Sequence, residues 1–233
     1  MKAVDISVIV PTYNEKGNII PLITAIMREL RTTHKTFEII VVDDSSPDRT
    51  GDLVKQTYRN TEPVRCIIRH SDPGLGASIL TGIRQVHGSV IIGMDADFNH
   101  DPLLLSSMIR SLSNADLVVA SRFIRGGGMK DVWRYLTSYA FNLVLHYCFG
   151  FPIWDNTSGY YAIRRSSLEC LNPNAIYKGY GEYHLILVYR AFQRGLRITE
   201  VPVYYSARRY GQSKSKFFTM VVSYIRTARE LSR

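Results

Sequence analysis

Short runs of apolar, mostly β-branched residues alternate along the chain with longer segments whose apolar residues recur at helical spacing. The short runs predict strands over residues 6–10, 38–42, 64–69, 90–94 and 117–120. The segments between them predict helices over residues 18–31, 48–59, 75–87 and 102–113. This repetition, with continuously apolar strands, is typical of an α/β fold in which helices cover both faces of a mostly parallel sheet.

The composition favours one globular unit. The chain has 233 residues, of which 45% are hydrophobic and 21% are charged, and this is the size of a single domain. Its three cysteines make an odd number and lack CxxC spacing, which indicates a reducing compartment rather than a disulfide framework or a zinc site. The longest apolar stretch, over residues 139–154, is interrupted by polar residues, so no membrane-spanning helix is expected.

Positive charge concentrates near the C-terminus. The formal net charge is +9, and residues 208–233 hold seven basic side chains against one acidic side chain. Such a field favours phosphate groups or anionic lipid, whereas a solvated helix face explains most runs of charge. Residues 216–233 also place apolar and basic side chains at helical spacing, which predicts a basic amphipathic helix that lies in a membrane interface or packs against its own domain.

Acidic side chains follow three of the predicted strands at the point where each strand ends. They are Glu15 after the first strand, Asp43 and Asp44 after the second, and Asp95 and Asp97 after the fourth. The carboxyl ends of parallel strands meet at one rim of the sheet, where ligands bind in folds of this class. We therefore expect these carboxylates to converge on one site.

The Asp95 and Asp97 pair is the part of this rim that predicts chemistry. Two carboxylates that alternate just beyond a buried strand can offer oxygen ligands to one Mg²⁺ or Mn²⁺ ion. Asp48 and Asp101 have a plainer interpretation, because each lies beside a predicted helix start and suits a capping role.

Several common motifs are missing from the sequence. There is no GxxxxGK[ST] phosphate loop, residues 72–76 supply only part of a GxGxxG pattern, and neither GxSxG nor HExxH occurs. The sequence therefore disfavours P-loop nucleotide hydrolysis, dinucleotide binding, serine hydrolase chemistry and zinc proteolysis.

A set of motifs, taken in order, resembles the family-2 glycosyltransferases of the GT-A fold. These motifs are PTYNE over residues 11–15, VDDSSPD over 42–48, GLG over 74–76, MDAD over 94–97 and SR over 121–122. DNTSG over residues 155–159 and RRYGQSK over 208–214 are similar to segments of the polyprenyl-phosphate sugar transferases of the dolichol-phosphate mannosyltransferase type. The resemblance implies a Rossmann-like GT-A catalytic domain over residues 1–214, followed by a C-terminal amphipathic helix over residues 215–233.

The resemblance also implies roles for individual residues on the donor side. The base and ribose of a nucleotide-diphosphate sugar would be held by Pro11, Tyr13, Glu15, Val42 and Asp44. The diphosphate and its metal ion would be lined by Asp95, Ala96, Asp97 and Asn99, of which Asp95, Asp97 and Asn99 are the expected metal ligands. Arg208 and Lys214 would close over the diphosphate.

On the acceptor side, the resemblance implies that Arg122, Arg134 and Ser138 hold the phosphate of a polyprenyl or dolichyl lipid. Guanidinium groups suit this role because they donate paired hydrogen bonds to phosphate oxygens. Asp97 and Arg122 are the residues expected to contribute directly to catalysis. An ionised phosphate nucleophile makes a catalytic base optional, since its second pKa is about 6.

The sequence departs from this family pattern at two positions. The glutamate that the family commonly has one helical turn later is replaced by an apolar residue near Ile186, so Glu182 is expected either to act from one turn earlier or to cap the following helix. Tyr161 replaces a basic residue. Two alternatives therefore stay open, namely transfer to a saccharide hydroxyl and a nucleotide-sugar or anionic-lipid sensor without turnover.

The functional expectation is inverting, metal-dependent transfer of a hexose, mannose from GDP-mannose being favoured, to a polyprenyl phosphate. The expected location is the cytosolic face of a membrane, because the lipid acceptor is confined there and the C-terminal helix is basic and amphipathic. A small membrane subunit is a further possible partner, and nucleic acid is not an expected one.

Overall fold

The computed structural model describes residues 4–59, 63–206 and 217–232 of the chain. The strands are β1 (Ile6–Thr12), β2 (Phe37–Asp43), β3 (Val64–Ile68), β4 (Val90–Gly93), β5 (Leu117–Ser121), β6 (Gly128–Met129), β7 (Tyr161–Arg164), β8 (Ile198–Pro202) and β9 (Tyr204–Tyr205). The helices are α1 (Ile19–Arg31), α2 (Thr50–Tyr58), α3 (Leu75–Ile83), α4 (Leu105–Ser111), α5 (Val132–Phe149), α6 (Arg165–Cys170), α7 (Pro173–Ile176), α8 (Glu182–Gln193) and α9 (Phe217–Leu231), with a short 3₁₀ helix at Pro102–Leu104.

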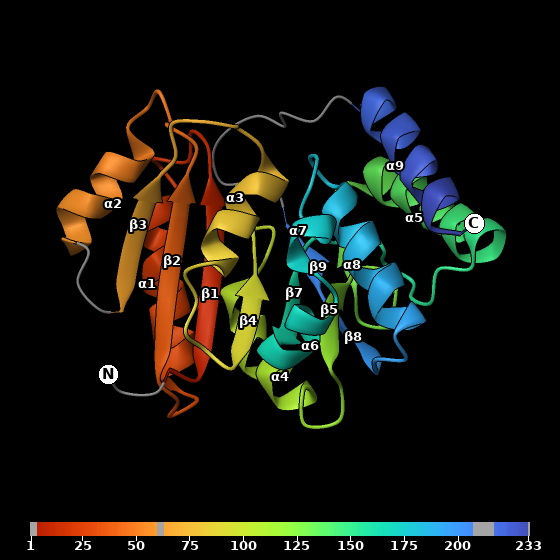
Figure 1. Ribbon diagram of the computed structural model, residues 1–233, viewed down its shortest axis with the longest axis horizontal. Coiled ribbons are helices and arrows are strands. Elements are labelled where there is room, and N and C mark those ends of the chain that lie inside the picture. The colour runs from red at the N-terminus through yellow and green to blue at the C-terminus, as the bar shows by residue number, and fades with distance from the viewer. Residues whose placement is uncertain (1–3, 60–62, 207–216, 233) are drawn as a thin grey trace.

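Seven strands form one sheet in the order β3-β2-β1-β4-β7-β5-β8 (Figure 1). The pairs β2–β3, β1–β2, β1–β4 and β5–β8 are parallel, whereas β7 runs antiparallel to both of its neighbours, β4 and β5. Because β7 is reversed between them, β4 and β5 point the same way. The loop that precedes β7 therefore reaches the same rim as the loops that follow β4 and β5, and β6 and β9 form a separate parallel pair.

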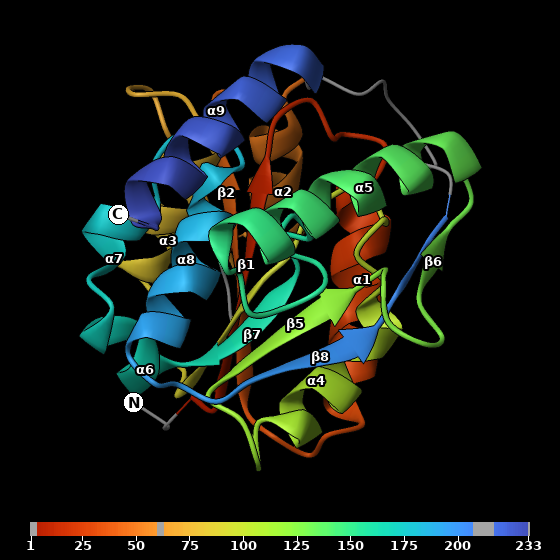
Figure 2. The ribbon, with the colours of Figure 1, turned by 90° about the vertical axis from the view of Figure 1, so that its right-hand side faces the viewer.

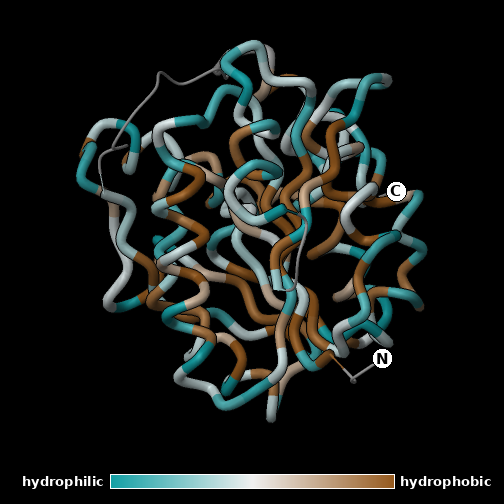
Figure 3. The backbone as a smooth tube through the Cα atoms, turned by 90° about the vertical axis from the view of Figure 1, so that its left-hand side faces the viewer, coloured by the Kyte–Doolittle hydropathy of each residue, from teal (hydrophilic) through white to brown (hydrophobic). Residues whose placement is uncertain are grey.

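Apolar side chains on alternate strand positions build a core on each face of the sheet. Val8, Val10 and Val41 pack on the face covered by α1, α2 and α4. Ile9 and Ile40 pack on the opposite face, which is covered by α3 and by α6–α8. Figure 3 shows the resulting pattern, with hydrophobic segments in the interior and hydrophilic segments around them.

The five strands and four helices expected from the hydrophobic pattern are all present. Their boundaries move by a few residues, and the segment expected as one helix over residues 102–113 divides into the 3₁₀ helix and α4. The expected mostly parallel sheet with helices on both faces is confirmed, and β7 is its one antiparallel member among the described strands.

The C-terminal helix α9 packs against the domain along one side. Tyr224 and Ala228 of α9 are buried in a small cluster with Leu145 of α5 and Leu185 of α8. Figures 1 and 2 show α9 beside α5 at the edge of the molecule. Across the described part of the chain, no helix combines the length and apolar character that crossing a membrane requires.

Candidate active site

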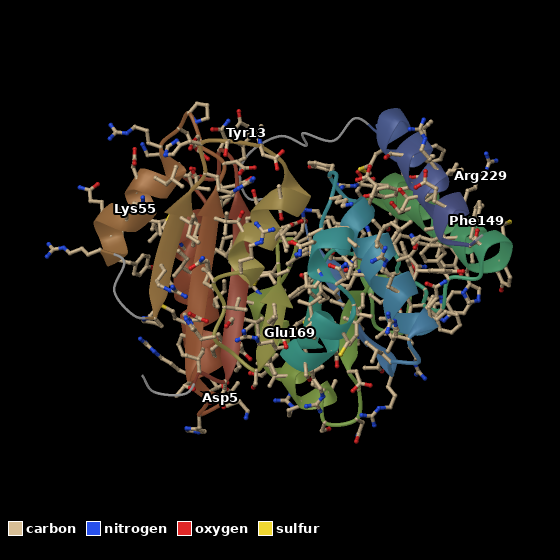
Figure 4. The ribbon with its side chains drawn as sticks, in the orientation of Figure 1. Asp5, Tyr13, Lys55, Phe149, Glu169 and Arg229 are labelled. Carbon is tan, nitrogen blue, oxygen red and sulfur yellow. The ribbon has the colours of Figure 1, made fainter. Side chains whose placement is uncertain are left out.

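A cavity of about 450 Å³ opens at the carboxyl ends of β1, β2 and β4. We call it the strand-end cavity. Its lining residues are Pro11, Thr12, Tyr13, Glu15, Asp44, Pro73, Gly74, Leu75, Ser78, Asp95, Ala96, Asp97 and Tyr180. In Figure 4 Tyr13 lies at this end of the sheet and Asp5 at the other. The acidic residues expected to share one rim therefore do so, although the side chain of Val42 is wholly buried in the core and does not line the cavity.

Asp44 fixes one wall of the strand-end cavity. Its carboxylate accepts a hydrogen bond of 2.6 Å from Nη1 of Arg69 and another of 2.9 Å from the backbone N–H of Gly74. Arg69 also donates to Oγ of Ser78 at 2.8 Å and to the carbonyl of Asp72 at 2.5 Å. The charge on Asp44 is thus paired, and the pair holds the loop over residues 71–74 against the cavity.

The neighbouring carboxylates accept hydrogen bonds from nearby hydroxyl and backbone N–H groups. Asp43 accepts hydrogen bonds from the hydroxyls of Thr12 and Ser46 and is buried. Asp48 accepts from the backbone N–H of Thr50, and Asp101 from that of Leu103. Asp101 is the N-cap of the 3₁₀ helix, which confirms the role expected for it, whereas Asp48 lies one residue before the N-cap of α2 and accepts the first N–H of that helix.

The turn after β4 brings the three expected metal ligands together. Asp97 accepts 2.9 Å and 3.1 Å hydrogen bonds from the side-chain and backbone N–H groups of Asn99. Phe98 between them has a φ of 64°, a left-handed conformation that reverses the chain and sets Asn99 against Asp97. The side chain of Asp95 is 42% exposed, whereas Asp97 is buried.

His100 holds this turn in place through a hydrogen bond to the backbone of Asp95. Its Nδ1 accepts a 2.7 Å hydrogen bond from the backbone N–H of Asp95, so a neutral ring carries its proton on Nε2, which faces the carbonyl of Ser158 at 3.3 Å. The ring also stacks on Tyr160 with centroids 4.7 Å apart. The sequence did not predict a role for His100, although this residue lies only five positions after Asp95.

The chemistry of this turn fits a divalent cation of the Mg²⁺ or Mn²⁺ type. Asp95, Asp97 and Asn99 offer side-chain oxygens, the ligand type that such ions prefer, and Mg²⁺ commonly takes one or two carboxylates together with waters and substrate phosphates. In the described ranges no group of three or more His, Cys, Asp or Glu side chains could by itself hold a metal ion.

A second cavity, of about 360 Å³, lies at the start of α5. We call it the α5 cavity, and it is lined by Asn99, Met129, Lys130, Asp131, Arg134, Tyr205 and Ser206. Arg134 and Lys130 are exposed cations on its wall. Ser138 lies one turn after Arg134 on the same face of α5 but is not among the lining residues.

Arg122 is held rigidly beside these cavities. Its Nε and Nη2 donate hydrogen bonds of 2.7 Å and 2.6 Å to the two carboxylate oxygens of Asp155, and Nη2 also donates to Thr157 at 2.9 Å. Burial disfavours the charge on Asp155, but the adjacent Arg122 outweighs it and holds the pKa of this carboxyl below its usual value. Glu200 in turn accepts the backbone N–H groups of Trp154 and Asp155, which fixes the loop that carries Asp155.

A third and smaller cavity, of about 120 Å³, joins the other two, and we call it the bridging cavity. It shares Asp95, Asp97, Leu75 and Tyr180 with the strand-end cavity, and it shares Asn99, Arg134 and Tyr205 with the α5 cavity. Arg122 and His184 also line it. The expected catalytic pair, Asp97 and Arg122, therefore faces one space between two larger ones.

Glu182 is engaged in hydrogen bonds at the start of α8. One carboxylate oxygen accepts the backbone N–H groups of Tyr180 and Gly181 at 2.7 Å and 2.9 Å, and the other accepts from the hydroxyl of Ser223 on α9. Glu182 is not among the lining residues of the three cavities. The N-cap of α8 is Gly181 and the helix has no side-chain cap, so Glu182 does not cap it and instead fixes the turn that precedes α8.

The two remaining donor-side candidates, Arg208 and Lys214, lie outside the described residues. Three further contributors to the site were not expected from the sequence, namely Asp155 as the partner of Arg122, Glu200 as its support, and His184 on α8. Of these three residues, only Asp155 could have been expected from the sequence, because it begins the DNTSG segment.

Comparisons with known proteins agree with this geometry. Residues 7–171 match the family described as glycosyl transferase family 2. The chain is 36% identical over 216 residues to the polyprenol monophosphomannose synthase of Mycolicibacterium smegmatis, which covers 89% of this chain and 79% of that protein. It is 34% identical over 213 residues to the undecaprenyl-phosphate mannosyltransferase of Micrococcus luteus, which covers 88% and 85%.

Two more relatives extend the comparison. The dolichol-phosphate mannosyltransferase of Pyrococcus furiosus is 31% identical over 226 residues, which are 95% of this chain but 62% of that longer protein. Among solved structures, a glucosyl-3-phosphoglycerate synthase from Mycobacterium tuberculosis in complex with Mn²⁺ and UDP has a TM-score of 0.74 at 22% identity, over 98% of this chain and 80% of that one. This structural similarity confirms the expected GT-A fold.

Proposed function

This chain belongs to glycosyl transferase family 2, and we propose that it transfers mannose from GDP-mannose to the phosphate of a polyprenyl lipid. The observation that carries the proposal is the bridging cavity, which joins a cavity edged by Asp95 and Asp97 to one edged by Arg134. Two substrates bound on either side would meet there. The relatives at 31–36% identity are named as mannose transferases or synthases of polyprenol, undecaprenyl and dolichol phosphates, which supports this choice of sugar and acceptor.

The nucleotide would occupy the strand-end cavity, which Pro11, Tyr13, Glu15 and Asp44 line. Its diphosphate would then reach the turn over residues 95–99. A divalent cation held there by Asp95, Asp97 and Asn99 would neutralise the charge that develops on the leaving diphosphate. Solved structures of the M. tuberculosis synthase with Mn²⁺ and with Mg²⁺ beside UDP support an ion of this type.

The acceptor phosphate would enter from the α5 cavity toward Arg134, with Arg122 beyond it. The hydrogen bonds of Arg122 to Asp155 and Thr157 use Nε and Nη2, so Nη1 is the nitrogen outside this set. A phosphate oxygen would attack the anomeric carbon as the bond to the nucleotide diphosphate breaks, and the configuration at that carbon would invert. Because the phosphate is already largely ionised near neutral pH, no side chain has to take its proton, which agrees with the absence of Glu182 from the lining of the three cavities.

The lipid tail of the acceptor would lie at a membrane surface on the outer side of α5 and α9. Trp133, Leu136, Val144 and Tyr147 are exposed on one stripe of α5, and Trp133 and Tyr147 are 76% and 74% exposed. Arg226 and Arg229 are exposed on the neighbouring helix α9. Aromatic and basic side chains together are typical of a helix pair that rests in a lipid interface. Peripheral association with the cytosolic face of a membrane is therefore part of the proposal.

The test is transfer of labelled sugar from GDP-mannose, UDP-glucose or UDP-N-acetylglucosamine to dolichyl and undecaprenyl phosphates, with Mg²⁺, with Mn²⁺ and with chelator. We expect a metal-dependent mannosyl lipid from GDP-mannose. The Asp97→Asn variant serves as the matched control and should lose on the order of a hundredfold or more in rate, since even groups outside the first ligand shell cost 10 to 100-fold. Nucleotide binding without lipid product would contradict the proposal and favour a saccharide acceptor or a sensor.

A further inference from the structure

His184 is a buried polar side chain that the fold leaves unsatisfied. It lies in the first turn of α8, is 1% exposed and lines the bridging cavity. Neither Nδ1 nor Nε2 has a hydrogen-bond partner among the residues that the structure describes. The large majority of buried polar side-chain atoms in proteins have a hydrogen-bond partner, so two such nitrogens without one, on a residue that lines a cavity, indicate that a ligand supplies a partner.

The surroundings of His184 keep its ring neutral. Burial lowers the pKa of the imidazole to about 4, with His100 and Arg122 acting in the same direction and Asp155 opposing them. The ring is flanked by the aromatic rings of Tyr161 and Tyr183, with centroids 6.0 Å and 6.2 Å away. A neutral imidazole offers one N–H donor and one nitrogen acceptor.

The position of His184 indicates which part of the substrates it meets. The bridging cavity separates the space assigned to the nucleotide from the space assigned to the acceptor phosphate. In a direct displacement, the group between leaving diphosphate and attacking phosphate is the sugar. We infer that His184 is a sugar-binding residue that forms a hydrogen bond, through one of its ring nitrogens, with a hydroxyl group of the transferred hexose, an inference that rests on the proposed function.

A hydroxyl group fits this ring better than a phosphate does. A hydroxyl can either accept from the protonated nitrogen of a neutral imidazole or donate to the unprotonated one, whereas an ionised phosphate only accepts and suits the cations Arg122 and Arg134. A site built around a substrate hydroxyl also discriminates strongly against analogues that lack it, because its own polar atoms are then left unpaired. His184 is therefore expected to determine sugar specificity.

The test combines a variant with a series of altered sugars. His184→Phe keeps an aromatic ring in place but removes both nitrogens, and His184→Gln keeps a donor and an acceptor. Each is assayed with GDP-mannose and with the analogues that lack the hydroxyl at C2, C3, C4 or C6. We expect His184→Phe to reduce kcat/KM for GDP-mannose by about tenfold, as for one lost hydrogen bond, and to show no added penalty with the one analogue that lacks the contacted hydroxyl. His184→Gln should retain part of the discrimination.

Thermal unfolding and metal titration separate this role from a structural one. His184→Phe should match or exceed the wild-type Tm, because replacing an unpaired buried polar group by an apolar ring of similar shape removes a cost of folding. The affinity for GDP alone and the concentration of Mn²⁺ that gives half-maximal rate should stay unchanged. His87→Phe, at the opposite end of the sheet beside Glu38, is the matched control and should transfer mannose like the wild type.

Several outcomes would overturn the inference. The first is that every analogue lowers kcat/KM by the same factor in His184→Phe as in the wild type. The second is a weakened response of His184→Phe to Mn²⁺. The third is a fall in the Tm of His184→Phe large enough to account for its lost rate. If the wild type transfers no sugar to lipid phosphates, the proposed function fails on its own. Calorimetry with GDP-mannose and GDP then decides the inference separately, since only the binding of GDP-mannose should weaken in His184→Phe.

Discussion

Arg122 and Asp155 form an ion pair that is closed off from solvent at the edge of the bridging cavity. Their side chains are 6% and 0% exposed, and two hydrogen bonds of 2.6–2.7 Å join them. Such a pair adds little stability over apolar packing, but removal of one partner leaves an uncompensated buried charge. The pair holds the guanidinium in a fixed position near the reacting groups.

We predict that Asp155→Asn lowers the free energy of unfolding by roughly 3–5 kcal/mol, the usual cost of breaking a buried pair. Urea denaturation followed by circular dichroism measures this change. Glu169→Gln is the matched control, because its partner Arg165 is exposed and such surface pairs contribute about 0.5 kcal/mol or less. Equal effects of the two substitutions would show that burial does not set the energy of the Arg122 pair.

His184 predicts a dependence of stability on pH. Its folded-state pKa of about 4 lies below the ordinary value of 6.5, so the unfolded chain binds the extra proton between these values. Stability should therefore be full above pH 6.5 and fall as the pH drops toward 4, by up to about 3 kcal/mol from this group. Unfolding curves of wild type and His184→Phe between pH 7 and 4.5 test the point, and parallel curves would contradict it.

At the scale of elements, α8 begins in a turn that leaves no room for larger side chains. A Cβ atom on Gly181 would lie 1.8 Å from the hydroxyl of Tyr224, and one on Gly179 would lie 2.6 Å from Oε2 of Glu182. Gly179 also has a φ of 67°, and its carbonyl accepts from the N–H of Gly76 on α3. The start of α8 is thus fitted closely to α3 and α9.

Glu182 secures this junction, so we predict a structural effect when it is changed. Glu182→Gln should lower the free energy of unfolding by about 1 kcal/mol, the usual net contribution of a hydrogen bond, and leave mannosyl transfer within a few-fold of wild type. Denaturation and steady-state kinetics on one preparation measure both effects. A loss of a thousandfold or more in kcat with unchanged stability would instead identify Glu182 as a catalytic base.

The exposed stripe of α5 makes a prediction about membrane binding. Replacing Trp133 and Tyr147 together by serine should weaken retention on vesicles of phosphatidylcholine and phosphatidylserine by about tenfold or more, since each aromatic ring buries apolar area in the interface. Cosedimentation measures this retention. Phe192→Ser on α8, whose ring is 51% exposed, is the control and should bind like wild type. Unchanged retention of the double variant would remove α5 from the proposed membrane surface.

At the scale of the whole molecule, the part of the site that the hydrophobic and acidic pattern predicted is the part built by parallel strands, whereas Arg122 and Arg134 were expected only from the resemblance. Asp44, Asp95 and Asp97 could be assigned to one rim because every parallel strand delivers its carboxyl end to the same side of the sheet. The Asp95 and Asp97 pair followed from its spacing after a buried strand, whereas Asn99 was implied only by the resemblance to the glycosyltransferases. No such rule places Asp155, Glu200 or His184, because the reversed strand β7 and the docking of α8 bring them in from late in the chain.

The missed elements have the same origin. β7 has only four residues, Tyr161–Arg164, and a run so short carries little periodicity. The stretch over residues 130–154 is rich in aromatic and aliphatic residues, and its composition fits both a core segment and one that meets lipid. In the structure one side of α5 is buried and the other is exposed, since Leu145 packs with α8 and α9 whereas Trp133 is exposed. Composition alone could not divide one helix between two environments.

The sharing of residues among the three cavities has a consequence for engineering. Among the described residues, the strand-end cavity is lined by positions up to 97 and by Tyr180, whereas the α5 cavity is lined only by positions from 99 onward. The two cavities proposed for the substrates are therefore lined in sequence order, apart from Tyr180, and the change from one to the other falls inside a single turn. Recombination of two homologous genes at that turn would join the nucleotide preference of one parent to the acceptor preference of the other.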